Sequence, residues 1–151
     1  MITMVRTFDK DYIKYLYSLE DMYNRTTDDY APSFEDFIPD TSPSKHHWVI
    51  VLNENKVAGM FRADNLGTHV YQTHIFIFKD HLHKSYEIGV KFLEYIKFFG
   101  RATSLIAIVG EHVPQVGPYI EKLGAKKVST LHDSVYKNKT VYDQHLYTLE
   151  V

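Results

Sequence analysis

A short basic segment between an apolar strand pattern and a helix pattern is the first feature of the sequence that could do chemistry. Residues 79–84 read KDHLHK, so Lys and His supply four of the six side chains. The segment leads into a helical pattern at 85–99, which a second strand pattern at 104–109 follows. Two strands joined by a helix form a βαβ unit, and the turn that leads into such a helix commonly binds phosphate. The segment therefore predicts a site for an anion.

Histidines are the other residues with obvious chemistry. His46-His47 and His81-x-His83 are close in sequence, but there is no Cys and no His-x-x-x-His spacing, so we expect no metal site. The absence of Cys also excludes disulfides and a cysteine nucleophile, and it fits a reducing compartment. His74 lies in the middle of an apolar strand pattern, where burial could move its pKa toward neutral pH. Strand histidines more often serve only as hydrogen-bonding groups.

Strand and helix patterns alternate along the chain and must position these residues. In chain order we expect strand 2–8, a helix from Asp9 or Asp11 to about Arg25, helix 33–38, strands 48–52, 56–61 and 69–78, helix 85–99, strand 104–109, a short helix before Gly124, and strands 126–131 and 141–150. The composition of strand 104–109 predicts burial on both of its faces. The pattern predicts a mixed α/β domain with a largely antiparallel sheet.

Composition limits the classes of protein to consider. The 151 residues fit one domain, 1–151, and 44% hydrophobic with 24% charged residues is typical of a globular protein. A net charge of −2 indicates no general attraction to nucleic acid or to anionic membranes. We find neither a signal-peptide core nor the roughly 20 apolar residues that a spanning helix needs, so we expect a cytoplasmic protein.

The phrase Tyr119-Ile120-Glu121-Lys122-Leu123-Gly124-Ala125 resembles the Y-x-K-x-G-F ending of the GNAT family of N-acetyltransferases. The expected order of elements, β-α-α-β-β-β-α-β-α-β-β, is also that of the GNAT fold and covers essentially the whole chain. The resemblance implies a mixed, largely antiparallel central sheet flanked by helices. It also implies acetyl-CoA as the co-substrate and an amine as the acceptor.

In GNAT proteins the pyrophosphate of acetyl-CoA faces a loop of the form R/Q-x-x-G-x-G/A at the start of the third helix. On this motif fall Lys84, Ser85, Tyr86, Glu87, Ile88 and Gly89. The resemblance thus implies that Lys84, Ser85, Tyr86 and Gly89 bind the cofactor, while the edge of the strand at Ile77 and Phe78 pairs with its pantetheine amides. Glu87 replaces a glycine of the motif. An ordinary capped helix, with Ser85 as its N-cap, is the alternative interpretation.

The family resemblance also implies an acid and a base. The base of GNAT enzymes is often a Glu or His on the fourth strand, which implies His74, with His69 and Gln72 as weaker candidates. The acid is often a Tyr of the last helix, which implies Tyr119, although the family position itself holds Ile120. A family Asn early in this helix has no clear counterpart, and its place falls near His112-Val113. Tyr119 could instead be a packing residue.

Two functions remain open. The first is an acyl-CoA-dependent N-acyltransferase that acts on a small-molecule or protein amine. The second is a non-catalytic assembly protein, because the segment from Val109 to Ala125 also resembles GNAT-like proteins of tailed bacteriophages. That resemblance leaves open a homodimer, phage assembly partners, and a place in the host cytoplasm or the virion. An acidic segment with Asp28, Asp29, Glu35, Asp36 and Asp40 could attract a cationic amine or form a solvated face.

Overall fold

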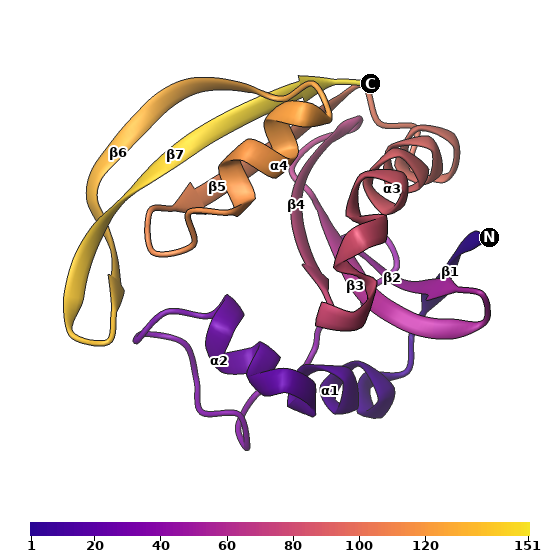
Figure 1. The fold of residues 1–151 in the computed structure, drawn as a ribbon, viewed down its shortest axis with the longest axis horizontal. Helices are drawn as coiled ribbons and strands as arrows, with labels where there is room; N and C mark the ends of the chain where they lie inside the picture. Colours follow the sequence, from indigo (N-terminus) through magenta and orange to yellow (C-terminus); the bar gives the residue numbers. More distant parts are fainter.

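The computed structural model describes all residues from Met1 to Val151, and its centre is a seven-stranded sheet with helices on both faces (Figure 1). The strands are β1 (Ile2–Thr7), β2 (His46–Asn53), β3 (Lys56–Asn65), β4 (Val70–Ile77), β5 (Ser104–Gly110), β6 (Lys126–Lys137) and β7 (Thr140–Glu150); the helices are α1 (Lys10–Ser18), α2 (Met22–Thr26), α3 (Ser85–Phe99) and α4 (Val116–Lys122). The strand order is β1-β2-β3-β4-β5-β7-β6, and only β4 and β5 are parallel. The predicted fold class is confirmed.

Helix α3 covers one face of the sheet and has the predicted bounds. Its apolar positions recur at helical spacing, so Ile88, Phe92 and Ile96 are all buried against the sheet. Phe92 stacks on Phe61 of β3 with 3.9 Å between the ring centroids. None of the helices, α3 included, has the length and apolar character needed to cross a membrane.

Helices α1 and α2 lie against the other face, where the prediction of a single helix to Arg25 is wrong. The chain breaks at Glu20 and Asp21, whose φ angles of 52° and 58° are left-handed. This break turns the chain, so that Met22 packs with Ile13 and Leu16 of α1 in a hydrophobic cluster on this face of the sheet. The helix predicted at 33–38 is also wrong, because that segment forms only a single turn, with Asp36 N–H donating to Ser33 O at 3.0 Å.

The β6–β7 hairpin is longer than predicted and curves toward α2 (Figure 1). Strand β6 is exposed over most of its length and contains two register shifts, so no hydrophobic alternation marks its second half. At its end the buried Lys137 ammonium donates to Asn24 O and, at 2.7 Å, to Thr27 O. The Asp29 carboxylate accepts from the N–H groups of Asn138 and Lys139 at 2.9 and 2.8 Å. These bonds join the hairpin tip to the end of α2.

Candidate active site

The sheet opens where β4 and β5 stop pairing. Their parallel ladder covers only Val70–Gln72 with Ser104–Ile106. Beyond it the strands diverge, as Figure 1 shows, and a central cavity of about 630 Å³ is lined by residues 72–76 of β4 and 107–110 of β5. Since successive strand residues face opposite sides, this cavity reaches both faces of the sheet. The prediction that β5 is buried on both faces is therefore wrong: Ile108 is 37% exposed and lines the cavity.

A second cavity of about 650 Å³, which we call the side groove, adjoins the central cavity at the start of α3. Its walls include the end of β4, Ser85 of α3, Tyr119 of α4 and Lys137 of β6. The residues that line both cavities, and so mark their junction, are Arg25, Thr26, Ile75, Phe76, His112, Val113 and Val116. The two spaces together run from α2 to the start of α3.

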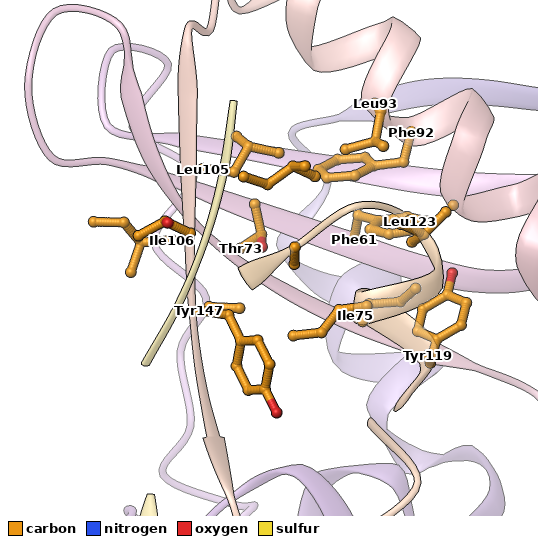
Figure 2. A pocket seen from close by; sticks show the side chains of 16 residues that line it. Phe61, Thr73, Ile75, Phe92, Leu93, Leu105, Ile106, Tyr119, Leu123 and Tyr147 are labelled. Carbon is orange, nitrogen blue, oxygen red and sulfur yellow. The ribbon is translucent and has the colours of Figure 1, made fainter. Parts of the chain in front are cut away.

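A smaller apolar pocket of about 50 Å³ lies between the sheet and the helices α3 and α4 (Figure 2). In Figure 2, Tyr119 of α4 and Leu123, which follows α4, lie on one side of this pocket and Tyr147 of β7 lies on the other. Thr73 and Ile75 of β4 reach it from the diverging edge of the sheet. The pocket shows that α4 is packed directly over the gap between the strands.

Strand β4 presents a backbone edge to the cavities. Phe78 N–H donates to Ala58 O of β3 at 2.8 Å. In an antiparallel ladder successive residues point their polar groups to alternate sides, so the N–H and C=O groups of Ile75 and Ile77 point away from β3. Since the ladder with β5 ends at Gln72, this edge has no strand partner. Of the predicted pair, Ile77 lies on the free edge, whereas Phe78 is buried and uses its N–H within the sheet.

The predicted anion loop is a 3₁₀ helix, Lys79–Lys84, that continues directly into α3. Ser85 N–H donates to Leu82 O, so this amide is used inside the chain. The Lys84 ammonium lies 3.3 Å from the Glu87 carboxylate. Tyr86, 57% exposed, points to solvent. The loop thus has the predicted basic side chains, but Lys84, the cation nearest the start of α3, is already paired with Glu87.

Gly89 makes room for α4. A Cβ atom at Gly89 would lie 2.6 Å from Leu123 Cδ1 and 2.7 Å from Tyr119 Oη. The hydroxyl of Tyr119 lies over Gly89 and donates a hydrogen bond to Ser85 O at 2.8 Å. Burial raises the pKa of the Tyr119 phenol far above its ordinary value, so it keeps its proton. Ile120, one residue along, faces the central cavity instead.

His74 lies on the α1–α2 face of the sheet and lines the central cavity. Its Nε2 is 3.2 Å from Asp64 Oδ2, and the other oxygen of Asp64 is 2.6 Å from His46 Nδ1. Burial alone would raise the pKa of Asp64, but hydrogen bonds from His74 and His46 and the charge of Arg62 lower it to about 2. Asp64 is a residue that sequence reasoning missed, since only strand register brings it beside His74. No group of three His, Cys, Asp or Glu side chains is arranged to hold a metal ion.

His112 is the second missed residue, and it follows β5 directly. Its ring lies over Gly110, where a Cβ atom would be 2.4 Å from its Nδ1. That Nδ1 is buried and has no hydrogen-bond partner. Burial and the nearby charge of Lys137 lower the pKa of His112. The only sequence signal for it was its position, at the place of a family asparagine.

Among the acidic residues of the segment after α2, Asp28 lines the central cavity. Asp29 binds the hairpin tip. Asp40 accepts from both the backbone N–H and the hydroxyl of Ser42. Of the five predicted acidic residues, Asp29 and Asp40 thus use their carboxylates in structural hydrogen bonds, and Asp28 lines the cavity.

Solved structures with a similar architecture include a spermidine N-acetyltransferase and a GNAT-family acetyltransferase. The chain matches the spermidine N-acetyltransferase from Vibrio cholerae, solved in complex with CoA and spermine, with a TM-score of 0.78 and 13% identity, covering 99% of this chain and 95% of that one. It matches the GNAT-family acetyltransferase of Streptococcus pneumoniae with a TM-score of 0.75 and 12% identity, covering 100% and 99%. No family model and no curated protein sequence matches the chain. The chain therefore has the fold of the GNAT acetyltransferases, with the parted strands β4 and β5 at its centre.

Proposed function

We propose that the protein is an acyl-CoA-dependent N-acyltransferase that transfers an acyl group, acetyl in the first instance, to an amine. The observation that carries this proposal is the parting of β4 and β5, which opens a central cavity continuous with the side groove at the start of α3. The arrangement supplies one space for an amine and one for an extended acyl donor. The GNAT fold of the chain supports the same reaction class.

The residues present fit the acyl donor well along β4 and less well at its phosphate end. The free backbone edge at Ile75 and Ile77 can pair with the amides of the pantetheine arm. Lys84, Ser85 and Tyr86 stand at the start of α3, where the helix dipole favours an anion, whereas Gly89 is covered by Tyr119 and Leu123. Glu87, which pairs with Lys84, opposes a pyrophosphate at this place. When bound, acyl-CoA supplies a thioester whose carbonyl carbon accepts the amine.

The chain's own side chains can handle the protons of the reaction. His74 faces the acceptor space and is oriented by the ionised Asp64, so we assign it as the base that takes the amine proton. Tyr119 lines the side groove and carries a proton, so we assign it as the acid, and its hydroxyl must leave Ser85 O to donate to the sulfur. Burial raises the pKa of this phenol, which disfavours the transfer. The bond from Tyr119 to Ser85 O fixes where that phenol lies.

The proposal is tested by calorimetric titration of the protein with acetyl-CoA, with dephospho-CoA and ATP as controls. We expect micromolar binding that is selective for acetyl-CoA over both controls. Equal binding of ATP would show a general anion site and would contradict an acyltransferase. The variant Ile75→Pro removes the Ile75 N–H from the free edge of β4. It should weaken acetyl-CoA binding about tenfold, which corresponds to the loss of one to two hydrogen bonds.

A second candidate is a non-catalytic protein of the same fold that takes part in protein assembly. The observation that favours it is the occupied anion loop, in which Lys84 pairs with Glu87 and Ser85 N–H bonds to Leu82 O. This candidate predicts no heat and no thermal shift at millimolar acetyl-CoA. Capture of a protein partner would then be the functional assay.

A further inference from the structure

His112 is the imidazole at the junction of the two cavities. It lines both the central cavity and the side groove, whereas His74 lines only the central cavity. Its place is fixed by packing: the ring rests on Gly110 and lies 5.5 Å from the ring of Tyr142 on β7. Under the proposed function, a group at this point faces both the amine and the acyl donor, where the reacting atoms meet.

The two nitrogens of His112 differ in their surroundings. Nδ1 is buried against Gly110 and has no partner, so the nitrogen that a ligand can reach is Nε2. A neutral imidazole carries its proton on one nitrogen only. A buried N–H without an acceptor is rarer and costlier than an unpaired acceptor, so the proton belongs on Nε2. The ring therefore presents an N–H donor to the junction.

The charges around His112 keep the ring neutral. From β6, the Lys137 ammonium and the burial of the ring disfavour a second proton, while Asp28, after α2, favours it. Tyr142 of β7 contributes only an aromatic ring at this contact. The neighbouring Glu111 carboxylate is 2.9 Å from His145 Nε2 and is thus engaged elsewhere. The net effect lowers the pKa of His112, so it is uncharged at neutral pH.

We propose that His112 is a further catalytic residue of the acyl transfer: its Nε2–H donates a hydrogen bond to the carbonyl oxygen of the acyl group. This inference rests on the proposed function. A neutral imidazole that polarises a carbonyl is an established catalytic device. It is distinct from a base, because no proton leaves or joins the ring.

The division of roles balances the reaction. The bond between the amine nitrogen and the acyl carbon forms, and the bond between that carbon and sulfur breaks. The proton that the amine loses moves to His74, and the sulfur receives the proton of Tyr119. Throughout, Nε2–H of His112 stabilises the negative charge that develops on the carbonyl oxygen. Such a donor typically contributes about 100- to 1,000-fold in rate.

The first test is nuclear magnetic resonance of the ¹⁵N-labelled histidines in the free protein, with the His112 signals assigned from the spectrum of His112→Gln. We expect a neutral ring at pH 7 with its proton on Nε2. Adding acetyl-CoA should shift the His112 signals and leave those of His132, 78% exposed on the hairpin, in place. A protonated ring, or a proton on Nδ1, would overturn the inference without touching the proposed function.

The second test uses matched variants in a thiol-release assay with acetyl-CoA and a panel of spermine, tyramine and glycinamide. His112→Phe keeps an aromatic ring without a donor and should lower kcat about 100-fold or more, with acetyl-CoA affinity unchanged. His112→Gln keeps an N–H donor and should recover most of the rate. His132→Phe is the control, and it should match the wild type.

The pH profile separates a donor from a base. His112→Phe should lower the plateau and keep the acid limb of the profile, whereas loss of that limb would make His112 the base and overturn the inference. Wild-type rates in His112→Phe would overturn it as well. If the wild-type protein releases no thiol with any amine and does not bind acetyl-CoA, the proposed function fails and His112 loses its role with it.

Discussion

Lys84, just before α3, and Glu87 in the first turn of α3 form one of two ion pairs with the same spacing and the same 3.3 Å separation; the other joins Lys91 and Glu94. Pairs of this kind contribute little to stability, because both partners are exposed to water. Their difference is position: one pair stands at the start of the helix, where an anion would bind, and the other lies two turns on. The second pair is therefore a built-in control for the charge of the first.

Glu87→Gln should strengthen acetyl-CoA binding about fivefold, because it removes a negative charge beside the diphosphate and frees Lys84, an effect of about 1 kcal/mol near a surface. Lys84→Glu should weaken binding by at least as much. Glu94→Gln changes net charge equally and should leave the dissociation constant unchanged in the same calorimetric titration. Equal effects of Glu87→Gln and Glu94→Gln would show that the diphosphate does not lie at the start of α3.

Tyr119→Phe removes one hydroxyl that donates to Ser85 O. We expect the unfolding free energy in urea to fall by about 1 kcal/mol, since a partly buried hydrogen bond is lost. If Tyr119 is also the acid, kcat should fall by about 100-fold, far more than the loss of stability explains. Tyr15→Phe, at an exposed position on α1, should change neither quantity.

Among the elements, α4 depends on α3 for its position, and Gly89 is the point of closest approach. Gly89→Ala places a methyl group within 2.7 Å of Tyr119 Oη and Leu123 Cδ1. We expect a loss of about 1–3 kcal/mol from overpacking, only partly offset by the better helix propensity of Ala. Gly67→Ala is the control, since nothing lies within 4 Å of its new Cβ. Urea denaturation of both variants makes the measurement, and equal stabilities would contradict the packing role.

The hairpin tip is the second dependent element, and Lys137 joins it to α2. Lys137→Met keeps the aliphatic chain but leaves the carbonyls of Asn24 and Thr27 without their donor. We expect the unfolding free energy to fall by about 1–3 kcal/mol. Lys139→Met should be neutral, because only the backbone N–H of Lys139 contacts Asp29. A neutral Lys137→Met would mean that water satisfies these carbonyls.

For the whole molecule, a buried histidine predicts how stability depends on pH. His47 is 8% exposed, and burial together with the charge of Arg6 lowers its pKa from 6.5 to about 4. Between these values the unfolded chain binds a proton that the folded chain does not. The stabilisation that comes from keeping His47 neutral is fully present above pH 6.5 and is lost as the pH falls toward 4. The free energy of unfolding therefore falls by about 3 kcal/mol over this range.

His47→Phe should flatten this part of the stability curve, because the new ring cannot be protonated and fits between Tyr71 and Tyr95, which His47 already meets edge-on. Urea unfolding at pH 4.5 and 7.5 gives the comparison. His132→Phe, at an exposed site, should retain the wild-type slope. A wild-type slope in His47→Phe would assign the acid sensitivity to other groups.

Much of this architecture follows from sequence periodicity, and the exceptions have physical causes. Helix α3 is predictable to the residue because its apolar stripe is regular and Gly100 ends it. The break at Glu20 is not, because it depends on packing against the sheet rather than on a local signal. The site is harder still. His74 stands out in its strand, but Asp64 joins it only through the register of β3 and β4, and His112 has no motif.

The parted strands β4 and β5 are connected at two places, and the bonds between the hairpin tip and the end of α2 form the second connection. The strands meet at the short β4–β5 ladder and are connected again where Asp29 binds the amides of Asn138 and Lys139. Their separation can therefore widen only when the second junction opens. Hydrogen exchange of the two amides at that junction thus reports how often it opens. If the exchange of these amides slows when an amine is bound, opening of this junction accompanies release of the amine.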